Sequence, residues 1–176
     1  MEGGTLAREI DDIAKRKKYK QNQYGDRKSR KDDYTGERVF SGNTKKAIKK
    51  HPIDKISDTD HVTPIKVVQS RYKGLSDDQQ RIIANSEHNY AITNSKLNRS
   101  KGGLENHEYL MRQTLKGENP GLKTSAKMLE KEAESRIAMR VQATAMYAEN
   151  VVHKISDTDF AMKAKGINQA GKEEAV

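Results

Sequence analysis

The stretch that organises this chain runs from Thr59 to Lys101, beginning TDHVTPI and ending HNYAITNSKLNRSK. Asp60 and His61 place a hard carboxylate ligand beside an imidazole whose usual pKa lies near neutrality. Asn98 adds an uncharged amide oxygen, and Lys101 lies about one helical turn further on, where it can face the same phosphate. These residue types suit a nuclease site that holds one divalent metal ion.

The stretch resembles the HNH nucleases, whose catalytic core is a ββα-metal fold. The first motif of that family, D-H-x-x-P, is similar to residues 60–64, and the last, N-x-x-K at the start of a helix, is similar to residues 98–101. The middle motif, an Asn before a short strand, is similar to Asn89 in the run NYAI, at a spacing from Asn98 like that of CRISPR-effector HNH domains. DYTGE at 33–37 resembles the turn that often precedes the first motif, so the resemblance covers roughly residues 32–104.

The resemblance implies an α+β fold class with a small ββα-metal HNH core. The gap between Pro64 and Asn89 is longer than in compact members, so we expect an inserted helix there. A basic helix before the core and a long amphipathic helix after it complete the expected architecture. The expected segments are a basic helix and linker at 1–31, the HNH core at 32–116, the C-terminal helix at 117–153 and a polar tail at 154–176.

The resemblance also implies a role for each matched residue. His61 is the expected general base, Asn89 holds its loop and orients it, and Lys101 contacts a nonbridging phosphate oxygen. Asp60 and Asn98 are the expected ligands of one Mg²⁺ or Mn²⁺ ion. Structural zinc, present in many relatives, is not expected because the chain has no cysteine. The remaining expected roles are nucleic-acid contacts by Arg99, Lys96 and Lys66.

The composition favours an anionic partner. The formal net charge is +9 and the isoelectric point about 9.6, so DNA is the first candidate, although a basic surface that merely keeps the protein in solution would look the same. With 33% hydrophobic residues, two Phe and no Trp, the chain can bury only a small core. The absence of Cys excludes disulfides and thiolate metal sites. No apolar run is long enough to span a membrane, so we expect no membrane partner and a cytoplasmic location in a bacterial or phage-infected cell.

The first half of the chain alternates basic and strand-like segments. Apolar residues at helical spacing predict a helix from Thr5, ending in the basic run 15–18, and residues 20–32 read as a linker. The basic clusters at 15–18 and 27–31 would contact phosphates or form a solvated face. The remaining predictions are a strand at 34–40 with a turn at Thr35-Gly36, a short helix at 44–48 and a strand at 56–65 that carries Asp60 and His61 and ends at Pro64.

The second half is mostly helical in pattern. Ser76 and Gln79 form a capping-box pattern, which predicts the inserted helix at about 76–87. The second strand of the core is expected at 89–93, with Asn94-Ser95 capping the element that holds Asn98 and Gly102-Gly103 ending it. A further helix is predicted at 104–115 and a turn at 119–121.

A long helix is predicted from 124 to 152, with a disordered tail after Lys154. Its apolar face is expected to pack on the nuclease core, although a dimer contact or partner helix remains open; the face comprises Leu129, Ala133, Ile137, Val141 and Ala145. The hexapeptide KISDTD at 55–60 recurs at 154–159, followed by Phe160 in place of His61. The second copy therefore lacks a base and has no evident function.

The function that these patterns favour is metal-dependent hydrolysis of DNA phosphodiester bonds by an HNH endonuclease. Two other classes remain open: a non-catalytic basic DNA-binding or phage-associated protein with a degenerate HNH fold, and a helical partner-binding module. Free-standing HNH proteins occur in phages, mobile elements and restriction or defence systems.

Overall fold

The computed structural model of the chain describes residues 9–41 and 49–173, with side chains as far as residue 158. The fold is of the α+β class, with two small antiparallel sheets of two strands each. None of the helices described is apolar enough over a sufficient length to cross a membrane. The elements in chain order are α2 (Ile13–Tyr24), β1 (Ser29–Lys31), β2 (Arg38–Phe40), η1 (Ile53–Lys55), β3 (Ser57–His61), α4 (Ile65–Arg71), α5 (Asp77–Ala84), η2 (Glu87–Asn89), β4 (Tyr90–Asn94), α6 (Ser95–Lys101), α7 (Asn106–Leu115) and α8 (Leu122–Glu173).

The centre of the body is a two-stranded ribbon followed directly by a short helix. Strands β3 and β4 pair antiparallel, with Asp60 opposite Ala91 and His61 opposite Tyr90. Asn94 ends β4 and caps α6, because its side chain accepts a hydrogen bond from the Leu97 amide. These features confirm the strand predicted at 89–93 and the predicted cap.

Two helix boundaries follow the sequence signals. Gly102 ends α6 with a positive φ of 59°, a conformation that glycine adopts without strain. The inserted helix is confirmed as α5, and Ser76 and Gln79 form both hydrogen bonds of the predicted capping box.

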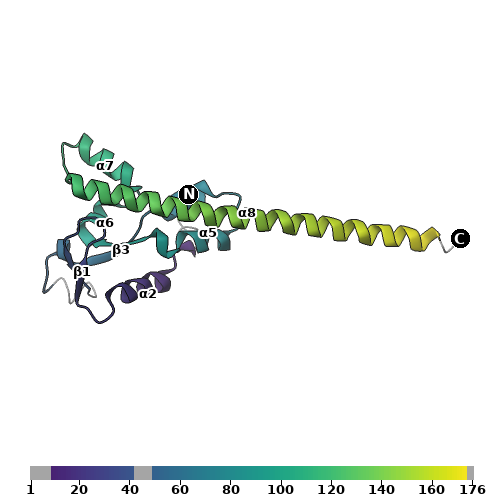
Figure 1. Cartoon of the computed structure of the whole chain (residues 1–176), viewed down its shortest axis with the longest axis horizontal. Coiled ribbons are helices and arrows are strands. Elements are labelled where there is room, and N and C mark those ends of the chain that lie inside the picture. The colour runs from purple at the N-terminus through teal and green to yellow at the C-terminus, as the bar shows by residue number, and fades with distance from the viewer. Residues whose placement is uncertain (1–8, 42–48, 174–176) are drawn as a thin grey trace.

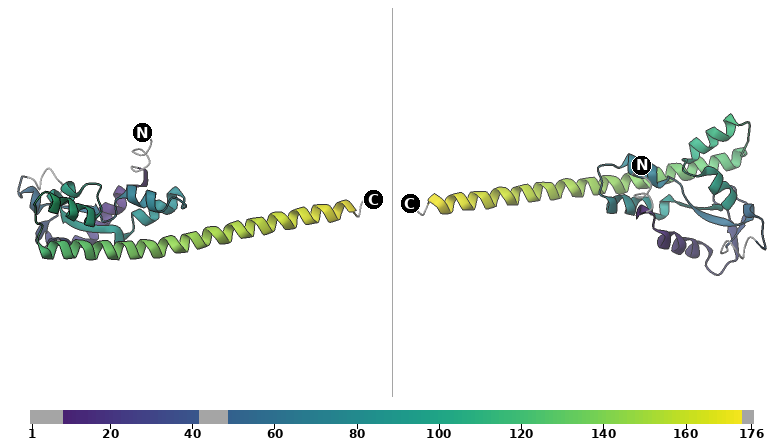
Figure 2. Two further views of the ribbon diagram at one scale, coloured as in Figure 1. Left: turned by 90° about the horizontal axis from the view of Figure 1, so that it is seen from above. Right: turned by 180° about the vertical axis from the view of Figure 1, so that it is seen from behind.

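Helix α8 lies along one side of the body and then extends far beyond it (Figures 1 and 2). Its first half packs against α7, α5 and η2. Met128 joins a cluster under the ribbon that includes Tyr34 and Val62, and Met139 joins a second cluster formed mainly with α4 and α5. A third cluster, of tyrosines Tyr19, Tyr24 and Tyr90 with Ile92, fixes α2 against β4.

The N-terminal predictions need correction. The helix α2 begins at Ile13 behind the cap Asp12 and continues through the expected linker to Tyr24, and β1 also lies within that segment. Burial of Tyr19 and Tyr24 explains the extension, since these aromatic side chains anchor a stretch whose composition looks like a loop. The predicted start at Thr5 lies outside the described residues, as does the helix predicted at 44–48.

Two strand predictions were too long. Only the last three residues of the predicted strand 34–40 form β2, because Asp33–Thr35 turn the chain so that β2 can pair with β1. The strand predicted at 56–65 ends at His61, and α4 begins at Ile65 behind Pro64. Proline is well suited to that helix start because its missing amide donor is not needed there.

The prediction for the C-terminal helix was wrong in two respects. The face expected to pack on the core is turned outward: Leu129 is 46% exposed, and Ile137 and Val141 are each 66% exposed. The packed face instead carries Met128, Glu132, Ser135, Met139 and Ala143. In addition, the tail expected to be disordered continues the helix to Glu173.

Candidate functional site

Four of the predicted site residues, Asp60, His61, Lys66 and Asn98, line one pocket of about 280 Å³. Asp60 and His61 come from the end of β3, and Asn98 comes from α6. The strand pairing and the cap at Asn94 fix α6 beside β3, so residues far apart in the sequence meet here. Arg16 of α2 and Lys66 of α4 complete the cationic part of the lining.

The protonation of the His61 ring is set by Asn85, which sequence reasoning missed. The Asn85 side-chain amide donates to the carbonyls of Ile10 and Arg81, and these two bonds fix which end of the amide is oxygen. That oxygen lies 3.4 Å from His61 Nε2 and can only accept, so Nε2 carries the proton. The Nδ1 lone pair is therefore left to take a proton from another molecule.

The pKa of His61 is lowered to about 4, mainly because burial disfavours the charged ring. The positive charge of Arg16 lowers the pKa further, and that of Lys101 contributes less. The Tyr90 ring meets the imidazole edge-on, with 5.2 Å between ring centroids. His61 is consequently neutral, and able to act as a base, throughout the physiological pH range.

Asp60 is nearly enclosed and already has two partners. Lys101 Nζ lies 2.8 Å from Oδ2 and 3.1 Å from Oδ1, and the Tyr34 hydroxyl donates to Oδ2 over 2.7 Å. Burial raises the pKa of Asp60, while these two donors favour the charged carboxylate and oppose that shift. A carboxylate has about four lone-pair directions, so Oδ1 retains the capacity to bind a further group from the pocket.

Lys101 does not face the pocket as the sequence suggested. Its side chain is completely buried, and Nζ also donates to the His61 carbonyl over 2.9 Å. No surface remains on this ammonium group for a phosphate to approach. Lys101 therefore holds the end of β3 in place and neutralises Asp60.

Asn89 lies beneath the loop after β3, as its expected role requires. Its oxygen accepts from the Thr63 amide at 2.7 Å, and its nitrogen donates to the carbonyls of Thr63 and Ala84 at 2.9 Å. The Ser135 hydroxyl of α8 also donates to the Asn89 oxygen. Asn89 thus ties the loop behind His61 to both α5 and α8, and it acts on the imidazole only through the backbone.

Arg16 is a second residue whose individual role the sequence did not reveal, although it lies in the predicted basic run 15–18. One terminal nitrogen pairs with Asp11 at 2.8 Å, and Nε is buried without a hydrogen-bond partner in the described part of the chain. A hollow of about 300 Å³ shares Arg16 and Asn98 with the pocket and adds Lys17 and Lys20. The basic face of α2 therefore borders the site.

The three expected nucleic-acid contacts divide into two groups. Lys66 is exposed at the start of α4 and lines the pocket. Lys96 and Arg99 are exposed on α6, outside the residues that line the pocket. A molecule bound over the pocket would reach Lys66 first.

The oxygen donors that could hold a metal ion are few. Over residues 9–41 and 49–158, no three His, Cys, Asp or Glu side chains are grouped so as to hold a metal ion. The Asp60 carboxylate and the Asn98 amide are the hard oxygen donors that the prediction assigned, and they line one pocket. That set fits Mg²⁺, which commonly keeps several waters and takes only one or two carboxylates from the protein.

Comparisons of this chain with protein-family models, with curated proteins and with solved structures found no match.

Proposed function

We propose that this chain is a metal-dependent endonuclease of the HNH type, which hydrolyses phosphodiester bonds in DNA. The observation that carries the proposal is the meeting of Asp60, His61 and Asn98 at one pocket, beside the guanidinium of Arg16. The order of elements supports it, since an antiparallel pair, β3 and β4, is followed at once by α6. The excess of positive charge in the chain favours the polyanionic substrate.

His61 is the general base of the proposed reaction. Its Nδ1 takes a proton from the attacking water while the water oxygen forms a bond to phosphorus and the bond to the leaving 3′ oxygen breaks. Asn85 keeps the second ring nitrogen protonated and the imidazole in place. Asn89 and Lys101 hold the backbone that carries His61.

Asp60 and Asn98 are the residues that would hold the Mg²⁺ or Mn²⁺ ion of this proposal. Oδ1 of Asp60 is the carboxylate oxygen with fewer partners, and no hydrogen bond in the described part of the chain occupies the Asn98 amide. A bound divalent ion supplies charge neutralisation at the scissile phosphate and the leaving oxygen. Arg16 lines the same pocket, so its guanidinium is placed to contact a nonbridging oxygen.

The test is cleavage of supercoiled plasmid in Mg²⁺, in Mn²⁺ and in EDTA. We expect nicking with either ion and none in EDTA. Asn98→Ala should raise the Mg²⁺ concentration needed for half-maximal cleavage by about tenfold or more, because weaker perturbations of metal sites already cost that much. Asn22→Ala, at an exposed amide on α2, is the matched control and should change nothing.

Binding of plasmid without cleavage in either ion would contradict the nuclease proposal. It would favour the non-catalytic DNA-binding alternative instead. Cleavage that continues in EDTA would show that the assigned metal ligands are not those of the reaction.

The exposed face of α8 favours a second candidate function, association through this helix with another copy of the chain. The outward apolar residues step by four along the helix, forming the kind of ridge that packs into the groove of an identical helix. An antiparallel copy that crosses at Ile137 would place this ridge against itself, with Ala133 facing Val141 and Leu129 facing Ala145.

Ile137→Glu is expected to convert such a dimer to a monomer, because it would place two carboxylates at the twofold axis in an apolar contact. Light scattering after size exclusion measures the mass directly. Lys131→Glu, on a different face of α8, is the matched control and should leave the mass unchanged. A wild-type chain that is monomeric at concentrations of about 100 μM would rule out this candidate function.

A further inference from the structure

A cavity of about 650 Å³ shares no lining residue with the candidate active-site pocket. It is formed where the end of α2, the hairpin of β1 and β2, and the start of α8 come together. Cationic side chains from the loop after α2, from both strands of the hairpin and from α8 line it: Arg27, Arg30, Lys31, Arg38 and Lys127. We call this cavity the hairpin pocket.

The two acidic residues of the hairpin pocket are already committed to other groups. Asp32 is buried, and its oxygens accept from the amides of Tyr34, Thr35 and Asn94 and from the side chains of Thr93 and Asn94. Asp33 accepts from the Ile92 amide at 2.6 Å and forms an ion pair with Arg30, also at 2.6 Å. These carboxylates hold the hairpin against β4 and neutralise only part of the pocket.

The remaining cations have no carboxylate within ion-pair distance in the part of the chain that the structure describes. Arg27 donates only to the carbonyls of Gln23 and Tyr24, while Lys31, Arg38 and Lys127 form no ion pair there. Like charges gathered around one cavity repel one another, so the arrangement is stabilised by an anion that enters it. Several phosphate oxygens would match this number of donors.

The conformation of the hairpin leaves room for one of these cations. Gly36 has a φ of 74°, and a Cβ built on it would lie 3.1 Å from Lys127 Nζ. A larger residue would therefore be strained and would displace the ammonium group. Gly36 belongs to the DYTGE turn, so this motif allows a cation of α8 to approach the hairpin pocket closely.

Helix α2 connects the hairpin pocket with the candidate active site. Arg16 lines the active-site pocket, Lys20 lines the hollow beside it and Gln23 lines the hairpin pocket. These three residues follow at helical spacing on one face, and the seven helical steps from Arg16 to Gln23 span about 10 Å. That length corresponds to about three base-pair steps of duplex DNA.

We infer that the hairpin pocket binds backbone phosphates of the DNA strand that enters the active site, about three nucleotides from the bond that is cut. The identity of the ligand rests on the proposed nuclease function, whereas the presence of a polyanion site rests on the pocket itself. Because its contacts are to phosphates, the pocket would position the substrate without reading its sequence.

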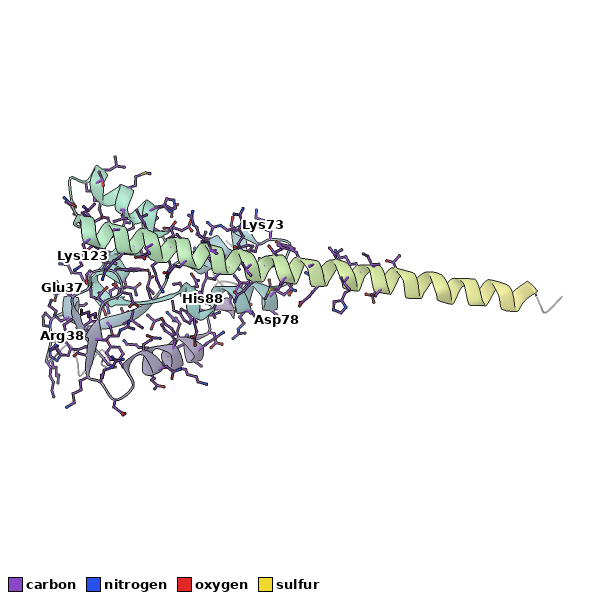
Figure 3. All side chains as sticks on the ribbon, viewed as in Figure 1. Glu37, Arg38, Lys73, Asp78, His88 and Lys123 are labelled. Atoms are coloured by element: carbon purple, nitrogen blue, oxygen red, sulfur yellow. The ribbon has the colours of Figure 1, made fainter. Side chains whose placement is uncertain are left out.

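The test compares two double variants that remove the same charge from different places. R38Q/K127Q removes two cations of the hairpin pocket. K73Q/K116Q removes two exposed cations outside it, and Arg38 and Lys73 lie at well separated places along the molecule (Figure 3). Binding to a duplex of about 20 base pairs is measured in EDTA at several salt concentrations, so that no cleavage intervenes. Urea denaturation of both variants verifies that each folds as the wild type does.

Each phosphate contact contributes about 0.9 to the slope of log K against log salt concentration. We therefore expect R38Q/K127Q to lower the magnitude of that slope by about 2 and K73Q/K116Q to lower it by less than about 0.5. Equal changes in the two variants would overturn the inference. Amide shifts around Arg30 on addition of millimolar inorganic phosphate, without a slope difference for DNA, would also overturn it and indicate a site for a small anion.

The outcome is separable from that of the nuclease proposal. Cleavage in Mg²⁺ with equal slopes would overturn only the hairpin-pocket inference. A slope difference without cleavage in any metal ion would support the phosphate site and overturn the nuclease proposal.

Discussion

Replacing His61 with alanine is expected to lower the rate of metal-dependent DNA cleavage by about 10²–10⁴-fold, the usual contribution of a general base. The imidazole lines the pocket with Asp60 and Asn98, and its Nδ1 is the ring nitrogen left to accept a proton. The measurement is the rate of plasmid nicking in saturating Mg²⁺. His61→Ala removes the base and leaves both proposed metal ligands in place, so at saturating Mg²⁺ a lower rate reports the loss of the base.

His88→Ala is the matched control for this prediction. His88 is exposed in η2, close to the site in sequence, and lines neither the pocket nor the hollow beside it (Figure 3). The His88→Ala variant should cleave plasmid at the wild-type rate. Equal cleavage by wild type and His61→Ala would assign the activity to another site or to a contaminant.

The pH dependence of cleavage gives an independent check on His61. Its pKa is lowered to about 4, so the ring stays neutral as pH falls from 8 to about 5. We expect the acid limb of the kcat/KM profile to lie near pH 4 and not near 6.5, the value of a free histidine. An inflection near pH 6.5 would show that the ring is more solvated in the working enzyme than in this structure.

The same shift predicts how stability depends on pH. The unfolded chain binds a proton at His61 below about pH 6.5, whereas the folded chain binds it only below about pH 4. The contribution of His61 to the free energy of unfolding is therefore complete above pH 6.5 and is lost as pH falls toward 4. Urea denaturation of wild type and His61→Ala across this range measures the difference.

Lys101→Met is expected to lower the free energy of unfolding at pH 7.5 by about 3–5 kcal/mol, the usual cost of removing one partner of a buried ion pair. Methionine can occupy the space of the lysine stem but leaves Asp60 buried without a cation. The bond from Nζ to the His61 carbonyl is also lost, so cleavage should fall together with stability. Urea denaturation measures the first effect and plasmid nicking the second.

Lys96→Met, on the exposed side of the same helix, should change stability by less than about 0.5 kcal/mol. Adding Asp60→Asn to Lys101→Met should recover part of the lost stability, because the double variant buries no charge. A double variant that is less stable than Lys101→Met alone would contradict the assigned role of the pair.

The loss in Lys101→Met should also depend on pH in a defined direction. Burial raises the pKa of Asp60, and without Lys101 the carboxyl would hold its proton to a still higher pH. A folded-state pKa above the unfolded value means that the folded state gains stability relative to the unfolded state as pH falls through that pKa. The difference from wild type should therefore shrink as pH falls toward 4, where Asp60 is neutral in the variant.

Local signals were sufficient for the elements nearest the site. The capping box at Ser76, the cap at Asn94 and the glycine at Gly102 each act through hydrogen bonds or backbone angles within a few residues. Their effects therefore depend only on neighbouring residues, and the positions of α5, β4 and α6 could be predicted. The motif spacing also placed Asp60, His61 and Asn98 as candidates for one site.

The contacts between residues far apart in the sequence could not be predicted from these local signals. Asn85 ends a helix that the sequence predicts, but its bond to His61 depends on how α5 lies against β3. Lys101 has the same local sequence as any lysine at a helix end, and only the packing of α6 on β3 buries it against Asp60, which also accepts from Tyr34. The same is true of the apolar ridge of α8. The hydropathy pattern identified the ridge, but it did not show that a different face of α8 packs on the core.

The repeated hexapeptide KISDTD shows most clearly the difference between what the local sequence determines and what tertiary contacts determine. At 55–60 it leads into and forms most of β3, where Ile56 is buried and Ser57–Asp60 pair with β4. At 154–159 the same six residues continue α8, with Ile155 exposed to solvent. The sequence alone determined the caps, the turns and the candidate site residues, because these depend on neighbours in the chain. Only the tertiary structure decided between strand and helix for this hexapeptide, since the first copy has a strand to pair with and a core to enter, while the second extends a helix that is already formed.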